Sequence, residues 1–166
     1  MLRTLLYITL LVSACMCAVS CADTCNDNRN SLPLAGFYVS GADGARQSVS
    51  NLAVIGASQG GDSVLSAADM LKDQIYLPFR IDEDVTKYVF VKEREGGELV
   101  DTVTFVYTRT PKFTSAACGV CYVFGMREIK SQGVLIDSVV CPAGYIDNVN
   151  VENLRIYFND DILDVQ

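Results

Sequence analysis

One pentapeptide of the chain has the residue types of a serine nucleophile. The sequence GASQG at residues 56–60 fits the G-x-S-x-G pattern, in which a strand feeds a sharp turn that exposes the serine above a sheet. The Ser-His-Asp triad needs a histidine, whose pKa lets it accept and return a proton near neutral pH, and the chain has none. Gly60-Gly61-Asp62 also breaks the chain where the pattern needs a helix. We therefore expect no enzyme here, an exposed hairpin loop over 56–62, and little effect of Ser58→Ala.

Acidic residues gather at several places, and paired carboxylates can hydrolyse glycosides. We interpret most of these residues as solvated turn positions, and a hydrolase using Asp82 or Asp160 is the least favoured function. Residues 26–30 lack the turn glycine and the twelfth-position glutamate of a calcium loop. We therefore expect no metal and no cofactor.

The beginning of the chain has the layout of a bacterial signal peptide. Arg3 precedes an apolar run, and small residues stand before Cys15 and before Cys21. Both sites resemble a lipobox, in which the cysteine is acylated and becomes the new N-terminus. Processing at Cys15 would leave an apolar stub, whereas processing at Cys21 begins a polar tether, so we predict lipidation of Cys21, with Cys15 as the alternative. Several acyl chains on one cysteine give stable anchoring.

The charge balance narrows the class of partner. Removal of residues 1–20 takes away one cation, Arg3, and leaves 12 Lys and Arg against 20 Asp and Glu. Nucleic acid and anionic surfaces attract proteins with surplus cations. The acidic balance therefore argues against nucleic acid or an anionic bilayer face as the partner.

The cysteines indicate an oxidising compartment. If Cys21 is acylated, four remain, and three pairings of them are open; they are Cys25, Cys118, Cys121 and Cys141. The C-x-x-C pair of 118 and 121 has no second pair, as a zinc ribbon needs, and opens no helix, as a thioredoxin-type site needs. Structural disulfides are therefore the favoured interpretation.

Most of the chain after residue 31 has the composition of β-strands, with Gly- and Asp-containing turns between them. Short strands at such spacing are typical of an antiparallel sandwich. The predicted strands are 32–40, 48–58, 74–79, 86–94, 99–110, 118–130, 133–141 and 153–158. We predict an all-β, immunoglobulin-like antiparallel sandwich of about 7–9 strands, with at most one short helical turn near 66–72.

Two strands show clean alternation, which assigns their faces. Tyr88, Phe90 and Lys92 share one face of the first, and Val103, Phe105 and Tyr107 share one face of the second. Glu95-Gly96-Gly97 is expected to join them as a hairpin. Aromatic residues of these strands and of 118–130 are interpreted as core.

A second hairpin would fix one disulfide. If 118–130 and 133–141 fold back about Ser131-Gln132, Cys121 and Cys141 come close to direct opposition, and a bulge at Gly125 could adjust the register. Cys25 is then left for Cys118. The domain plan is a signal peptide (1–20), a tether (21–31), the sandwich (32–160) and a tail (161–166).

Several segments together resemble a known family. They are the closely spaced Cys21 and Cys25, the strand Leu34 to Val39, the strand DTVTFVYTR at 101–109 followed by ACG at 117–119, and NLRIYF at 153–158. In these segments the chain resembles small, uncharacterised lipoproteins of bacteroidete envelopes, a domain-of-unknown-function family. The likeness covers most of residues 21–158.

The resemblance implies a lipid-anchored β-sandwich with a Cys25–Cys118 bridge, and it implies no activity. Cys121 and Cys141 are additions to the family pattern. We expect a non-catalytic binding or structural module of the bacterial envelope, anchored to the lipid bilayer, at the outer membrane, with an outer-membrane protein as partner. The alternative is a glycan-binding accessory lipoprotein.

Overall fold

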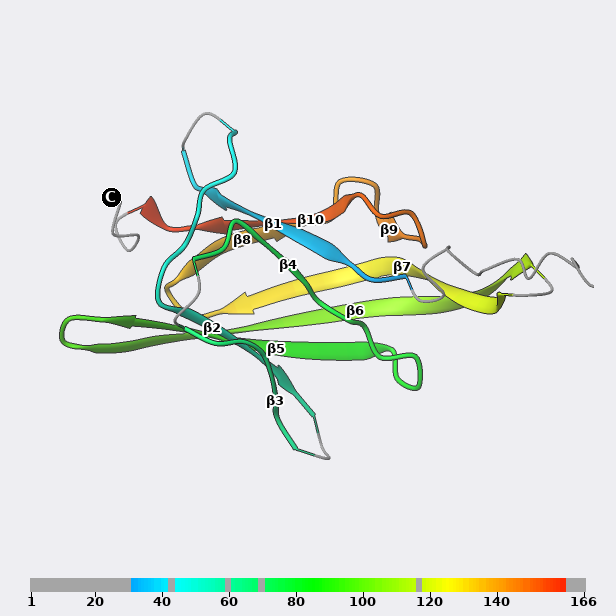
Figure 1. The fold of residues 1–166 in the computed structure, drawn as a ribbon, viewed down its shortest axis with the longest axis horizontal. Helices are drawn as coiled ribbons and strands as arrows, with labels where there is room; N and C mark the ends of the chain where they lie inside the picture. The colour runs from blue at the N-terminus through cyan, green and yellow to red at the C-terminus, as the bar shows by residue number, and fades with distance from the viewer. Residues whose placement is uncertain (1–30, 42–43, 59–60, 69–70, 116–117, 161–166) are drawn as a thin grey trace, which may run out of the picture.

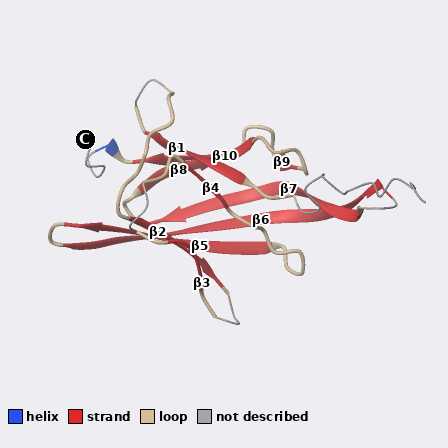
Figure 2. Cartoon of the chain, in the orientation of Figure 1, coloured by secondary structure: helices blue, strands red, loops and turns tan. Residues whose placement is uncertain are grey.

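The computed structural model describes residues 31–41, 44–58, 61–68, 71–115 and 118–160, which fold into two facing β-sheets (Figures 1 and 2). The predicted all-β sandwich is confirmed, with ten strands in these ranges. The strands are β1 (Leu34–Val39), β2 (Leu52–Ala57), β3 (Ser63–Ser66), β4 (Gln74–Tyr76), β5 (Val85–Arg94), β6 (Gly97–Ser115), β7 (Gly119–Gln132), β8 (Ile136–Val140), β9 (Tyr145–Ile146) and β10 (Glu152–Phe158).

The strands divide into a small and a large sheet. The four-stranded sheet has the order β4-β1-β10-β8, and the six-stranded sheet has the order β3-β2-β5-β6-β7-β9. Neighbouring strands are antiparallel except β1 and β10, which pair in parallel with Phe37 opposite Ile156. This parallel pair was not predicted, because it joins the first and last described strands and leaves no local signal in the sequence.

No helical turn is seen at the described positions near 66–72. Ser66 ends β3, and Lys72 forms an isolated antiparallel bridge with Val49. Asp69 and Met70 lie outside the described residues.

Alternation along the long strands places the core as expected. Tyr88 and Phe90 on β5 and Val103, Phe105 and Tyr107 on β6 are all buried. They pack with the inward faces of the small sheet, where Phe37 meets Phe158 edge to face. The predicted face assignment is confirmed, including the burial of Lys92, whose Nζ donates to the Ser50 carbonyl (3.1 Å).

Two predicted hairpins are confirmed. β5 and β6 pair from Arg94 opposite Gly97, with Glu95-Gly96 as the turn; the positive φ of Gly96 (95°) suits a glycine there. β2 and β3 pair with Gly56 opposite Ser63. Gly56 and Ala57, which were expected in the loop 56–62, belong to β2, and Ser58 lies between β2 and β3.

The predicted hairpin between 118–130 and 133–141 is wrong. After β7 the chain crosses to the small sheet, where β8 pairs with β10, and only the short β9 returns to pair with β7. The prediction followed the turn signal at Ser131-Gln132, which is real but marks a corner between sheets.

The Cys121–Cys141 disulfide is wrong for the same reason, since both thiols are free. The turn after Cys141 contacts β7 through Gly144, whose carbonyl accepts a hydrogen bond from the Met126 N–H (2.9 Å). Met126 and Cys121 are five residues apart, about 17 Å along a strand, whereas a disulfide joins Cα atoms roughly 4.4–6.8 Å apart. Cys118 is disulfide-bonded, and Cys25 lies outside the described residues, so the Cys25–Cys118 pair stays a prediction.

A buried carboxylate holds the corner between β7 and β8. Asp101, fully buried on β6, accepts hydrogen bonds from the Val134 N–H (2.8 Å) and the Ile136 N–H (2.7 Å). Gly133 lies against it, and a Cβ there would stand 1.8 Å from the Asp101 Oδ1. The φ of Gly133 is 140°, which also favours glycine. Asp101 and Gly133 therefore act together to stabilise the corner at which the chain passes from one sheet into the other.

We predict that Asp101→Asn lowers the free energy of unfolding by about 1–3 kcal/mol, because the amide nitrogen would face a backbone N–H and leave it unsatisfied. Urea denaturation followed by circular dichroism measures the change. Asp62→Asn, in an exposed loop, is the matched control and should shift stability by less than about 0.5 kcal/mol. Equal midpoints for Asp101→Asn and the unaltered chain would contradict the role of the carboxylate.

Candidate functional site

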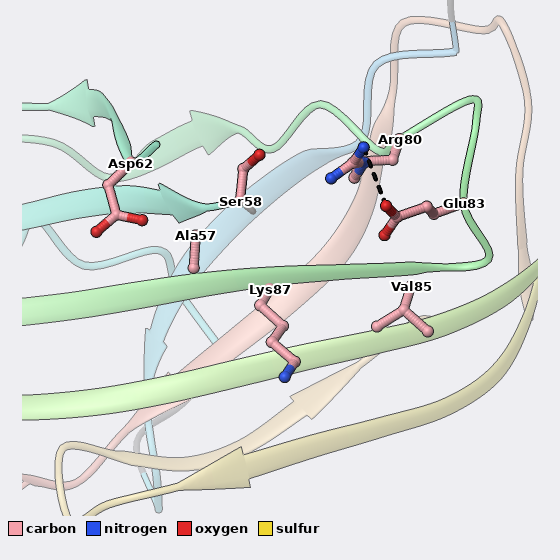
Figure 3. A pocket seen from close by; sticks show the side chains of 7 residues that line it. All are labelled: Ala57, Ser58, Asp62, Arg80, Glu83, Val85 and Lys87. Carbon is pink, nitrogen blue, oxygen red and sulfur yellow. Dashed lines mark ion pairs between the residues drawn. The ribbon is translucent and has the colours of Figure 1, made fainter. Parts of the chain in front are cut away.

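The serine of the pentapeptide lies at the rim of an open groove between the end of β2 and the loop before β5 (Figure 3). The groove has a volume of about 430 Å³ and is lined by Ala57, Ser58, Asp62, Arg80, Glu83, Val85 and Lys87. Ser58 is exposed, and its carbonyl accepts a hydrogen bond from the Gly61 N–H (3.2 Å). The predicted exposed turn is confirmed.

The side chains around the groove do not converge on the serine. The Lys87 ammonium points away from the Ser58 hydroxyl, and Asp62 lies on the other side of the groove from Arg80 (Figure 3). Nucleophilic catalysis needs a base within hydrogen-bond reach of the serine, oriented by a third group. Lys87 is therefore not oriented as that base.

Two arginines neutralise the acidic loop 82–84. Arg80 pairs through Nη2 with Asp82 (2.6 Å) and with Glu83 (3.1 Å), and Arg109 on β6 pairs through Nε with Asp84 (2.7 Å). Arg109 also donates to the Ile81 carbonyl. The acidic triplet was predicted to be solvated; it is exposed, but each carboxylate has a cationic partner.

A closed ring of hydrogen bonds fixes the backbone of the same loop. The Arg80 N–H donates to the Thr86 hydroxyl (3.0 Å), and the Tyr107 hydroxyl donates to the Arg80 carbonyl (2.9 Å). Since the Tyr107 proton is used in this way, the Thr86 hydroxyl donates to the Tyr107 oxygen (2.6 Å). Phe79 stacks on the Tyr107 ring at 4.6 Å between centroids. The loop is therefore a rigid part of the sandwich.

The carboxylates do not form a glycosidase pair. The hydrogen bond from Arg80 lowers the pKa of Asp82, whereas a general acid needs a raised pKa. Asp160 follows the end of β10, at the opposite end of the long axis from the loop 80–84 (Figure 1). Asp82 and Asp160 therefore do not share a site.

A second surface, on the outer face of the small sheet, has the residue types of a binding site. We call it the tyrosine face and define it as Tyr38, Tyr76, Arg155 and Tyr157. Tyr38 and Tyr157 are opposite each other on β1 and β10, with ring centroids 5.4 Å apart. The Arg155 guanidinium lies 5.6 Å from the centre of the Tyr38 ring, within the range of a cation–π contact. Tyr76 on the edge strand is 42% exposed.

Glu152 holds this surface in place. Both of its carboxylate oxygens lie 2.8 Å from the Tyr38 hydroxyl, and it also pairs with Arg155 (3.0 Å) and Arg46 (3.3 Å). Glu152 raises the pKa of Tyr38, second only to burial. Its carboxylate lies over Gly36, where a Cβ would stand 2.2 Å from Oε2. The orientation of the tyrosine face is thus set before any partner binds.

Sequence reasoning missed Arg80, Arg109 and Glu152. One arginine lies two residues before the acidic triplet 82–84 and another lies downstream of it, which is a signal for the first two. Nothing in the sequence marks Glu152, because its partners come from strands far apart in the chain. The predicted lipidation site Cys21, its alternative Cys15, and Cys25 lie outside the described residues.

Two features of the described ranges bear on other types of site. No helix in them is long and apolar enough to cross a membrane. They also contain no group of three or more His, Cys, Asp or Glu arranged to hold a metal ion.

The described fold is that of a two-sheet β-sandwich protein with rigid, pre-oriented surface groups. The chain belongs to a family of unknown function (DUF6452), which matches residues 51–158. The match runs from β2 to β10 and includes the loop 80–84 and Glu152. No curated protein and no solved structure matches the chain. The resemblance to an uncharacterised family is confirmed at this level.

We predict that Tyr107→Phe lowers the free energy of unfolding by about 1–3 kcal/mol, because it leaves the Arg80 carbonyl and the Thr86 hydroxyl without their partner. Ser58→Ala is the control, since its side chain is exposed, and it should change stability by no more than about 0.5 kcal/mol. Denaturant midpoints measure both. If Ser58→Ala lowered the free energy of unfolding more than Tyr107→Phe, the structural role assigned to the Tyr107 hydroxyl would be contradicted.

Proposed function

We propose that the protein is a lipid-anchored, non-catalytic binding module of the bacterial cell envelope, placed at the outer membrane, which docks an envelope protein on its tyrosine face. One observation carries the binding role: Glu152 fixes the exposed Arg155 beside Tyr38, which is itself only 7% exposed, on the outer face of the small sheet. Tyr and Arg are enriched among residues that dominate binding energy, and a pre-oriented surface loses less entropy on binding.

The proposed absence of catalysis has a chemical basis. The sequence contains no histidine, and the loop carboxylates are occupied by Arg80 and Arg109. Burial raises the pKa of Tyr107, so its phenol stays protonated near neutral pH. The ion pairs and hydrogen bonds of these groups stabilise the loop 80–84, which supports the proposal of a non-catalytic module.

The lipid anchor rests on the sequence. Arg3, the apolar run and the small residues before Cys21 form the expected signal. Ser31, ten residues after Cys21, is the first described residue and is buried against the sandwich. The intervening chain is polar, as a tether outside the bilayer should be.

We predict that the protein incorporates labelled palmitate in a bacterial host that processes lipoproteins, and that Cys21→Ser abolishes the label. Globomycin, which blocks lipoprotein signal peptidase, should cause the unprocessed form to accumulate. Cys15→Ser is the matched control and should retain the label. Label that persists in Cys21→Ser but is lost in Cys15→Ser would move the anchor to Cys15.

A glycan is the second candidate ligand, because an exposed phenol ring with a polar group at its edge suits a sugar. Tyr76 is 42% exposed on the edge strand β4. Its hydroxyl donates to the Asn150 side chain (2.8 Å), which orients the ring.

A photo-crosslinking residue at position 76, in the full chain in native membranes, separates the two ligands. We predict an adduct with one envelope protein, and no such adduct from the same residue at position 64. Val64 is 67% exposed on β3 of the other sheet. An adduct whose mass shift is removed by periodate would favour the glycan, and equal adducts from both positions would contradict a specific tyrosine face.

A further inference from the structure

The two longest strands extend beyond the rest of the sandwich as a two-stranded ribbon (Figure 1). Its described part, which we call the ribbon end, comprises 110–115 of β6 and 119–123 of β7. At its tip Phe113 lies opposite Val120. Phe113 is 69% exposed and Val120 is 54% exposed. An aromatic and an aliphatic side chain exposed at the tip of a projection do not contribute to the hydrophobic core. Exposed apolar side chains that lie together in this way are typical of contact with another surface.

The charge of this segment differs from that of the chain. The protein has 20 Asp and Glu and a net charge of −7, yet no acidic residue occurs from Arg109 through Arg127. Lys112 is exposed on the ribbon end, where its Nζ donates to the Asn148 side chain (3.2 Å). An acid-free, weakly cationic projection is compatible with the anionic headgroups of a membrane, from which carboxylates would be repelled.

The described chain begins beside the ribbon. The Ser31 hydroxyl donates to the Tyr122 carbonyl, so the segment that leads from Cys21 reaches the sandwich at the base of the ribbon end. Ten residues span at most about 35 Å when fully extended. A lipid attached at Cys21 therefore keeps the ribbon within that distance of the bilayer surface.

The disulfide bond of Cys118 is a second reason to place the ribbon end close to the lipid anchor. Cys118 directly precedes β7 at the end of the ribbon and is disulfide-bonded. If its partner is the predicted Cys25, only three residues lie between the bond and the acylated Cys21, and the four steps from Cys21 to Cys25 span at most about 14 Å of extended chain. The anchor and the ribbon end would then be held at the same place.

We propose that the ribbon end rests in the headgroup region of the membrane that holds the lipid anchor, with Phe113 and Val120 in contact with the acyl chains. The inference rests on the proposed lipid anchor and adds a second, protein-mediated contact that fixes the orientation of the domain. A bilayer accepts a small apolar tip without shape complementarity, and a single aromatic side chain at the interface is sufficient for such contact.

The chain contains no tryptophan, so one introduced tryptophan reports on one position. Phe113→Trp in the full, processed protein is reconstituted into phosphatidylethanolamine–phosphatidylglycerol vesicles, with or without phospholipid brominated on its acyl chains. We expect bromolipid to lower the emission at least about twofold, because the tip lies at the headgroup–acyl boundary. Val120→Trp, at the cross-strand neighbour, should give the same result if Phe113→Trp fails to fold.

Val64→Trp is the matched control, since Val64 is equally exposed but lies on β3, at the far edge of the same sheet. Its emission should not depend on bromolipid. Unquenched emission from both ribbon variants in acylated, membrane-bound protein overturns the membrane contact alone. Blue-shifted but unquenched emission would assign the tip to a protein contact and also overturns it.

The mass of the N-terminal peptide from the same sample shows whether Cys21 is acylated. A chain without the acyl groups would overturn the proposed anchor, and the inference with it. The two failures are therefore distinguishable in one preparation.

Discussion

The Asp101 carboxylate determines how the two sheets are connected. It lies on β6, at the centre of the large sheet, and accepts the backbone N–H groups of Val134 and Ile136, where the chain turns into the small sheet. Without that acceptor, the buried N–H of Ile136 and the partly buried N–H of Val134 would lose their partner where the chain leaves β7. The crossing sets the position of β8, and β8 in turn supports β10. The tyrosine face and the parallel β1–β10 pair therefore depend on this corner.

The sequence predicts those features of the fold that arise from neighbours along the chain. Alternation in β5 and β6 identified the buried faces, because successive side chains of a strand point to opposite sides of the sheet. Glycines between the strands marked the hairpin turns. The corner at Gly133 carried the same local signal as a hairpin, and only the remote Asp101 makes it a crossing between sheets. The incorrect Cys121–Cys141 bridge followed from that ambiguity.

The surface features were less accessible from the sequence. Gly36 reads as an ordinary strand glycine, yet its missing Cβ leaves the space that Glu152 occupies. Tyr38 and Tyr157 come together through a parallel pair between the two ends of the domain. A pairing of this kind depends on the whole fold, whereas the exposed position of Ser58 followed from the Gly60-Gly61-Asp62 turn signal that comes directly after it in the sequence.

The two proposed contacts are geometrically compatible. The ribbon end projects along the long axis of the molecule, and β1 and β10, which carry Tyr38 and Tyr157, run along the same axis (Figure 1). A domain that stands on its ribbon end would therefore hold the tyrosine face roughly upright, at the side of the domain and clear of the bilayer. A partner inserted in the same membrane could reach that face laterally. The rigid loop 80–84 and the Asp101 corner would keep the angle between the two contacts constant, which is what a small anchored binding module requires.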